Sequence, residues 1–411
     1  MGKSNLKKNL LLVHLESLNQ LNYRMNPELF PFLKKIEREC LVFNNYYSTA
    51  TSTLMVIGEL LYGGLYLYEE CKNFDDAPDK YCYTSSLFDD LKDKGYNTGI
   101  YIYPDANGTE GAESRHLAGF KHSMELLPDY SEYMESFERK MSQEPFALMA
   151  CNYISNLSFN TYVDINKYGM DEDFWEVGYR GMDKCCADLL ELLKNKDRME
   201  NTVVVFYGDH GDDYWGHGMH SGWTHGIEPN LLLIHTPLFV WDGTKRTEPE
   251  YDARLIQTTD LRELIERLLE GKSISDLPRR KYAISRNEYA AQPIRMETLN
   301  KAYSVTDGYY LLMVSGKGLE MYDNKSDPAC QNNLLRFFDY KNSVLKASAR
   351  KRKGLAYQFT VFMDARKERI IRQKFYELLA VLKEETLKLY VAGGRTEDDM
   401  LGEMRFDVLA K

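Results

Sequence analysis

The sequence lacks an excess of basic residues, paired cysteine motifs and long apolar runs, and each absence excludes a class of protein. Its 52 Lys and Arg against 62 Asp and Glu give a formal net charge of −10, which argues against a nucleic-acid binder because such proteins concentrate cations to neutralise phosphates. The 7 cysteines are odd in number and show no Cys-x-x-Cys spacing, so no disulfide framework is expected. The first apolar run ends at His14 and Glu16, too early for a signal peptide or a membrane span. We therefore expect a cytoplasmic protein.

The sequence instead contains an alternation of short apolar runs and amphipathic segments. Continuous apolar runs such as NLLLVHL are typical of buried parallel strands, and segments with apolar residues at helical spacing separate them. The predicted strands are 9–15, 41–48, 145–153, 202–211 and 236–242, the predicted helices are 27–39, 53–62, 173–196 and 258–271, and 86–105 is predicted as helix, glycine turn and strand. This order predicts an α/β fold, a three-layer α/β/α sandwich with a mostly parallel central sheet.

The pattern changes near residue 280 to short β runs and then to basic, helical sequence. We predict a catalytic α/β domain over 1–278, a small antiparallel β subdomain over 279–335 and a basic helical region over 336–411. Basic amphipathic helices can contact a membrane surface or a membrane protein. A solvated helical face that covers the catalytic domain is the interpretation that we favour.

The stretch GDHGDDYWGHGMHSGWTHG, residues 208–226, holds four of the 8 histidines directly after an apolar run. Ligand sites in open α/β sheets form beyond the carboxyl ends of the strands, where Glu16, Asp209 and His210 fall. An acid at a strand end is also typical of a turn. Together, two carboxylates and an imidazole suit a divalent metal ion such as Zn or Mn, with Mg or Ca as alternatives.

A hydroxyl cluster, YSTATST, opens the predicted helix 53–62. Free backbone N–H groups and the helix dipole favour an anion such as phosphate there, and metal activation would make Thr53 a nucleophile. A simple N-cap is the alternative. His14 lies on the same strand face as Glu16, and we interpret it as a buried, hydrogen-bonded histidine. Asp212 and Asp213 are either acids that orient an imidazole or residues of a solvated turn, and the solvated turn is the interpretation that we favour.

These segments resemble the alkaline phosphatase superfamily in its sulfatase-like branch, and within it the catalytic domains of lipoteichoic acid synthases and phosphoethanolamine transferases. NLLLVHLES looks like their first strand, NYYSTATSTLMVIGELLYG like the segment with the nucleophile, and NTVVVFYGDHGD like the late strand with metal ligands. GLEMYDNKSDPACQNNLL resembles a C-terminal stretch of sulfatases. The resemblance extends along most of the chain.

The resemblance implies roles for individual residues. Glu16, Thr53, Asp209 and His210 would bind one metal ion, and Thr53 would be the nucleophile. In WTHGIEPNLLLIHTPLFVW, His225 takes the place of a transferase histidine and would stabilise charge on the non-bridging oxygens.

Other positions are expected to contact the substrate or the leaving group. His217 or His220 would protonate the leaving oxygen. The expected substrate-binding residues are Thr51, Ser52, His116 and Asn156, the last of which stands where the transferases place a histidine.

The chain also departs from the branch. Sulfatases carry Cys or Ser in a CxPSR context for conversion to formylglycine, whereas Thr53 is followed by LMVI, which disfavours sulfate-ester hydrolysis by that route. The segment CNYISNLSFNTY, residues 151–162, has neither histidine nor acid where two-metal relatives bind a second ion, which favours a single metal.

The expected function is that of a metal-dependent phosphotransferase or phosphodiester hydrolase with a phospho-threonine intermediate. It would move a phospho-alcohol group, phosphoethanolamine or phosphoglycerol, from a phosphodiester or phospholipid-derived donor onto or off a glycan. A sulfatase-like hydrolase of phosphonate, phosphodiester or sulfate esters is one alternative, and a catalytically inactive scaffold with the same fold is another.

Overall fold

The computed structural model describes residues 7–64, 85–103, 124–127, 129–155, 174–213, 228–244, 246–277, 279–287, 301–337 and 355–407. The described residues form two compact units, and the boundary along the chain falls between Arg280 and Lys281. Residues 228–231 group with the second unit.

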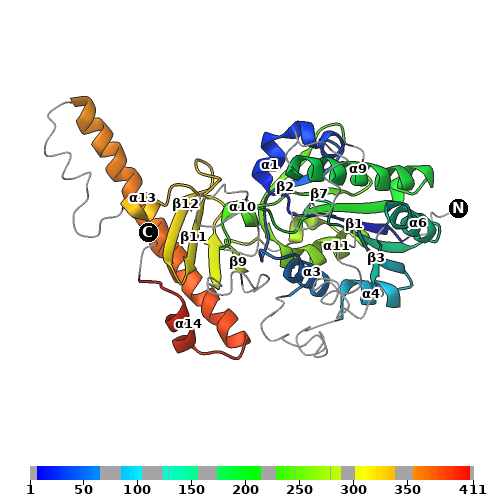
Figure 1. Cartoon of the computed structure of the whole chain (residues 1–411). Coiled ribbons are helices and arrows are strands. Elements are labelled where there is room, and N and C mark those ends of the chain that lie inside the picture. The colour runs from blue at the N-terminus through cyan, green and yellow to red at the C-terminus, as the bar shows by residue number, and fades with distance from the viewer. Residues whose placement is uncertain are drawn as a thin grey trace. The chain divides into compact units, whose positions relative to one another are not determined.

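The first unit is built on a mostly parallel sheet of eight strands in the order β4-β3-β5-β1-β6-β7-β2-β8 (Figure 1). Its strands are β1 (Asn9–Leu15), β2 (Leu41–Tyr47), β3 (Asn97–Tyr103), β4 (Met124–Leu126), β5 (Phe146–Asn152), β6 (Thr202–Gly208), β7 (Leu238–Trp241) and β8 (Glu250–Gln257). Only β7 is antiparallel to its neighbours, β6 and β2. The predicted mostly parallel α/β sheet is confirmed.

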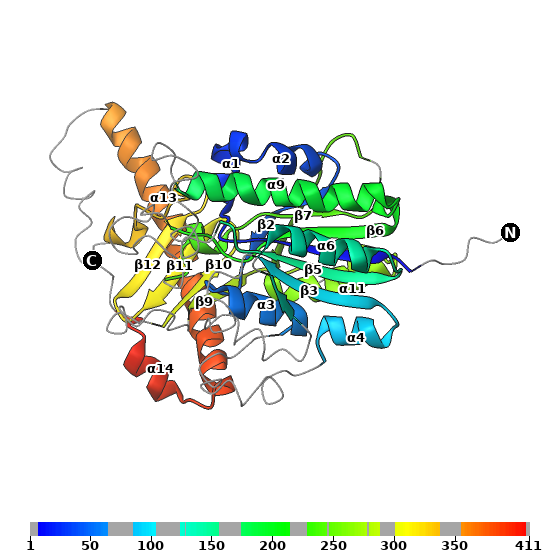
Figure 2. The same cartoon turned by 45° about the vertical axis from the view of Figure 1, so that its right-hand side comes forward.

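Helices cover both faces of this sheet (Figures 1 and 2). One face carries α1 (Gln20–Met25), α2 (Pro31–Glu37), α6 (Tyr130–Met141) and α9 (Phe174–Asn195), and the other carries α3 (Thr53–Tyr62), α4 (Leu87–Asp93) and α11 (Leu261–Leu269). A short helix, α10 (Leu231–Ile234), precedes β7. Helix α3 matches its predicted bounds and ends at Gly63, whose φ of 66° is the left-handed conformation that glycine adopts without steric cost.

The predicted helix 27–39 is shorter and interrupted. A 3-10 turn over Pro27–Leu29 is followed by α2, and Phe30 between them has the non-helical angles φ −127° and ψ 48°. The ring of Pro31 explains the interruption, because it disfavours helical angles at the residue before it.

The second unit contains the predicted antiparallel sheet, in the order β12-β11-β10-β9. Its elements are β9 (Ala283–Asn287), β10 (Ala302–Thr306), β11 (Tyr310–Ser315), β12 (Gly318–Asp323), α13 (Leu355–Ala392) and α14 (Glu397–Glu403). Side chains of α13 share one hydrophobic core with this sheet, as Leu378 and Leu382 do with Leu312 and Val314. The C-terminal helices therefore bury an apolar face against the small sheet. Within the described parts of the chain, no helix combines the length and the apolar character needed to cross a membrane.

Candidate metal and nucleophile site

The register of two neighbouring strands places the predicted carboxylates side by side. Strands β1 and β6 are parallel, and Leu15 pairs with Gly208. The next residue on each strand is therefore an acid, Glu16 on β1 and Asp209 on β6, and both are fully buried. The carboxyl ends of the two central strands thus create a buried, doubly acidic position, as the sequence predicted.

Backbone and hydroxyl groups around Ser17 hold these two carboxylates in place. Its hydroxyl donates to Oε1 of Glu16 at 2.9 Å, and its backbone N–H donates to Oδ1 of Asp209 at 3.2 Å. Ser17 has a φ of 57°, a conformation that non-glycine residues rarely adopt and that often occurs at functional sites. Tyr179 donates to the carbonyl of Ser17 at 2.9 Å, and Ser155 to the carbonyl of Glu16 at 2.6 Å.

Thr53 and His210 meet beside the carboxylates. Thr53 is the first residue of α3, and its Oγ1 lies 3.0 Å from Nε2 of His210 and 3.5 Å from Oε2 of Glu16. Nδ1 of His210 is 3.0 Å from the carbonyl of Gly211. A carbonyl only accepts, so Nδ1 carries the proton and Nε2 presents its lone pair toward the Thr53 hydroxyl. The predicted residues Glu16, Thr53, Asp209 and His210 are thus brought together.

A second imidazole, that of His14, faces the same carboxylates. Its Nε2 lies 3.1 Å from Oδ2 of Asp209 and 3.3 Å from Oε2 of Glu16, and its side chain is fully buried. Burial raises the pKa of the Asp209 carboxyl, but the His210 and His14 imidazoles more than offset this and hold that pKa well below its ordinary value. The carboxylate of Asp209 is therefore in its anionic form, as a metal ligand must be.

The chemistry of these residues fits a divalent cation. His14, Glu16 and Asp209 each offer one ligand atom within 4.8 Å of the others. Oδ2 of Asp209 is buried and has no hydrogen-bond donor among the described residues. Buried carboxylates are stable when they are paired or coordinate a metal. Glu16, Asp209, His210 and Thr53 are the residues that would hold the ion.

The remaining predicted residues divide into two groups. Thr51 and Ser52 are buried directly before Thr53, and Ser52 is the N-cap residue of α3. Five predicted residues lie outside the described parts of the chain, namely His116, Asn156, His217, His220 and His225.

The interpretation of Asp212 and Asp213 as a solvated turn is wrong. Both side chains are buried, because the segment after β6 passes into the interior rather than over the surface. Asn19, at the start of α1, donates its side-chain N–H to the backbone carbonyl of Asp212 at 3.1 Å. The acidic segment is therefore part of the buried interior of the first unit.

Sequence reasoning missed the groups that orient the carboxylates, namely Ser17, Ser155 and Tyr179. Ser155 and Tyr179 donate to backbone carbonyls 139 and 162 positions away, so no local pattern could indicate them. Ser17 is adjacent to Glu16, but its contact with Asp209 also depends on the pairing of distant strands. For His14 a signal existed, since it shares the strand face of Glu16.

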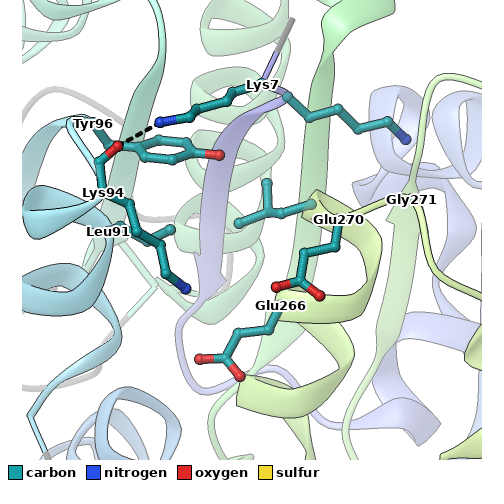
Figure 3. Close-up of a pocket in the computed structure, with 9 residues that line it drawn as sticks. Lys7, Leu91, Lys94, Tyr96, Glu266, Glu270 and Gly271 are labelled. Atoms are coloured by element: carbon teal, nitrogen blue, oxygen red, sulfur yellow. Dashed lines mark hydrogen bonds between the residues drawn. The ribbon is translucent and has the colours of Figure 1, made fainter. Parts of the chain in front are cut away.

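A cavity of about 400 Å³ lies at the opposite end of the sheet and includes none of the site residues (Figure 3). Lys7 precedes β1 and Tyr96 precedes β3, so the cavity is at the amino ends of the strands. Lys7 donates to the carbonyl of Lys94 at 2.6 Å across one wall. This cavity is therefore separate from the candidate metal and nucleophile site, which lies at the carboxyl ends of the strands.

Gly211 has almost no space for a side chain, which yields a prediction. A Cβ at this position would lie 1.9 Å from the carbonyl oxygen of Leu232 and 2.6 Å from Cβ of Asn19. We expect Gly211→Ala to lower the free energy of unfolding by about 2 kcal/mol or more and to displace the adjacent His210. Urea denaturation with and without metal would measure both effects.

Gly402→Ala, in α14, is the matched control, because a Cβ there meets nothing within 4 Å. It should be neutral or slightly stabilising, as alanine is in a helix. Equal stability of the two variants would contradict the close approach at Gly211.

The fold and the site together define the class of protein. A mostly parallel α/β/α sandwich with acids and histidines at the carboxyl ends of β1 and β6, and a hydroxyl at the start of α3, is the arrangement of the alkaline phosphatase superfamily. A family model described as Sulfatase matches residues 8–174 and 178–269, more than half of the chain. The chain therefore belongs to the sulfatase family, in the sulfatase-like branch of that superfamily, and is an enzyme of this type.

Solved structures share this fold at low sequence identity. The protein BT4656, solved with its substrate D-glucosamine-2-N,6-O-disulfate, has a TM-score of 0.60 and 13% identity over 94% of this chain and 98% of its own. A phosphonate monoester hydrolase of Agrobacterium radiobacter has a TM-score of 0.56 and 12% identity, covering 86% and 96%. An alkaline phosphatase superfamily protein from Vibrio parahaemolyticus has a TM-score of 0.57 and 16% identity, covering 79% and 82%. A sequence comparison with curated proteins gives no match.

Proposed function

We propose that the enzyme cleaves or transfers phosphate esters with Thr53 as its nucleophile and one divalent metal ion as its cofactor. The observation that carries this proposal is the position of the Thr53 hydroxyl. It stands at the first residue of α3, 3.0 Å from Nε2 of His210 and 3.5 Å from Oε2 of Glu16. An alcohol so placed is next to two bases and to the N–H groups that favour an anionic ester.

The nucleophile segment favours phosphate over sulfate esters. The residue at the start of α3 is Thr53, followed by Leu54, Met55 and Val56, so the Cys or Ser, Pro and Arg of a formylglycine segment are missing. A threonine side chain acts as an ordinary alcohol nucleophile. The fold similarity to a phosphonate monoester hydrolase is consistent with phosphorus chemistry.

A divalent ion held by Glu16, Asp209, His210 and Thr53 would supply a Lewis acid that lowers the pKa of the alcohol and offsets charge on the ester oxygens. Oγ1 of Thr53 forms a bond to phosphorus while the bond to the leaving oxygen breaks in line. The hydroxyl proton passes to Oε2 of Glu16, which it faces at 3.5 Å, because the lone pair on Nε2 of His210 would be used to bind the ion.

The first step leaves a phospho-threonine, and His217 or His220 protonates the leaving oxygen. His225 stabilises charge on the non-bridging oxygens. Water or an acceptor hydroxyl then attacks the phosphorus, and the bond between phosphorus and Oγ1 of Thr53 breaks, which regenerates the alcohol. Attack by water gives hydrolysis, and attack by an acceptor hydroxyl gives transfer.

For the substrate, we propose a phosphodiester that carries a phospho-alcohol group, phosphoethanolamine or phosphoglycerol, with a glycan as acceptor or carrier. The sugar substrate of BT4656 is consistent with a carbohydrate near such a site. A phospholipid-derived donor supplies the same phosphodiester chemistry.

The test is release of p-nitrophenol from phosphodiester, phosphonate and sulfate esters by protein loaded with Zn or Mn, with and without sugar acceptors. We expect turnover of the phosphorus esters to exceed that of the sulfate ester with each metal. A rate that rises with acceptor concentration indicates transfer, and a rate independent of it indicates hydrolysis. Faster cleavage of the sulfate ester would contradict the proposal.

A further inference from the structure

We propose that His14 is a direct ligand of the metal, and that the resulting pair of imidazoles makes the site selective for zinc-like ions over Mg or Ca. This inference rests on the metal-dependent function proposed above. It adds a ligand that the resemblance does not assign and narrows the choice of metal.

The distances around His14 are those between neighbouring ligands of one ion. Its Nε2 lies 3.1 Å from Oδ2 of Asp209 and 3.3 Å from Oε2 of Glu16. On the other side of Asp209, Nε2 of His210 lies 3.2 Å from the same Oδ2. Ligand atoms about 2.1 Å from a tetrahedral or octahedral centre lie about 3.0–3.4 Å apart. His14 is thus as close to the carboxylate of Asp209 as the predicted ligand His210 is.

These short distances are not hydrogen bonds, although every atom involved is buried. Neither ring nitrogen of His14 has a hydrogen-bond partner among the described residues, and the same holds for Oδ2 of Asp209. A histidine that only served the core would donate from one nitrogen to an acceptor, because an unpaired buried polar atom is destabilising. Because Nε2 of His14 and Oδ2 of Asp209 lie close together without a hydrogen bond, their geometry is that of two ligands of one metal ion.

The orientation of the His14 ring is fixed by aromatic neighbours. Tyr207 stacks on it with centroids 5.6 Å apart at an interplanar angle of 30°, and Tyr153 meets it edge-on at 5.7 Å and 77°. Both tyrosines are buried. The ring is therefore held with Nε2 toward the carboxylates, as a ligand must be held by the residues around it.

The donor set has a consequence for the metal. With His14, the site offers two imidazole nitrogens, two carboxylates and the Thr53 hydroxyl. Imidazole favours zinc and similar transition ions, whereas Mg and Ca prefer sets made of oxygen. His14 thus shifts the preference of a site that Glu16 and Asp209 alone would leave open to Mg or Ca.

The test counts imidazoles bound to zinc by X-ray absorption at the zinc edge, on the full-length protein. We expect two imidazoles in the wild type and one in His14→Asn. By chelator competition, the zinc affinity of His14→Asn should fall at least about 100-fold. Its affinity for Mg should change far less, so the selectivity for zinc should decrease.

His235→Asn is the matched control, because His235 belongs to the same unit but hydrogen-bonds through Nε2 to the carbonyl of Asn44 and stacks on Tyr47. It should keep two imidazoles and the wild-type affinity. Circular dichroism of the metal-free variants reports folding, and if His14→Asn is unfolded, the wild-type count decides.

One imidazole in the wild type overturns the inference, as does an unchanged count in folded His14→Asn. The result is separable from the proposed function. A site with two imidazoles and no phosphodiesterase activity would contradict only the substrate, and an active enzyme with one imidazole would contradict only the role of His14.

Discussion

Thr53→Ala is expected to lower kcat/KM for a phosphodiester by about 10⁴-fold or more at saturating metal, because it removes the attacking oxygen. The first position of a helix accepts alanine, so the fold should be retained with a loss of roughly 1 kcal/mol in the free energy of unfolding. Steady-state kinetics, with metal content measured on the same samples, separates loss of the nucleophile from loss of the ion.

Thr53→Ser is the matched variant for this prediction, because it keeps an alcohol at the start of α3. It should retain most of the activity that Thr53→Ala loses. Acid quenching during turnover should trap a phosphate on the peptide that contains Thr53 in the wild type and not in Thr53→Ala. Wild-type turnover by Thr53→Ala would place the nucleophile elsewhere.

The central strands of the fold could be predicted because strands that are buried on both faces have mostly apolar sequences. Strands β1 and β6 are covered on both faces, so every residue from Asn9 to Leu15 and from Thr202 to Gly208 is buried. Continuous apolar runs follow from such burial. The edge strand β8 was not predicted, because its first residues are exposed and its sequence, EYDARLIQ, therefore has no apolar run.

Helix α6 and the direction of strand β7 were also not predicted, for two different reasons. Helix α6 has a recognisable signal in the sequence, with buried Tyr133, Phe137 and Met141 four residues apart and Asp129 as N-cap. The antiparallel direction of β7 could not be predicted, because strand direction depends on how the chain returns to the sheet and not on the composition of the strand.

The candidate site was predictable to the extent that strand ends determine it. Glu16 and Asp209 follow directly after buried strands, and parallel pairing brings such positions together. Thr53 was predictable as the start of a helix. The shared strand face of His14 and Glu16 was also predictable, but the sequence does not show whether the nitrogens of His14 meet a carbonyl or two carboxylates.

Asp209→Asn is expected to abolish the rise in melting temperature that zinc gives the wild type. Oδ2 of Asp209 lies 3.1 Å from Nε2 of His14 and 3.2 Å from Nε2 of His210, so it is the oxygen between the two imidazoles. Asparagine keeps the shape of this side chain but removes the charge, and the affinity for metal should fall by about 100-fold or more. A ligand present at 100 times its Kd stabilises the folded state by about 2.7 kcal/mol. If the Kd for zinc rises above the zinc concentration in the sample, this stabilisation disappears. Thermal melts in zinc and in chelator measure the difference.

The control for this prediction is Asp183→Asn, which alters another buried aspartate of the same unit. The carboxylate of Asp183 accepts the backbone N–H groups of Leu33 at 2.8 Å and Phe32 at 3.0 Å, in the first turn of α2. Its loss should lower the melting temperature equally in zinc and in chelator, because it weakens the fold without touching the ion. Asp209→Asn should instead melt at the same temperature in zinc and in chelator, whereas the wild type melts at a higher temperature in zinc. If Asp209→Asn kept that rise in full, the ion would bind elsewhere, and the carboxyl ends of β1 and β6 would not form the metal site.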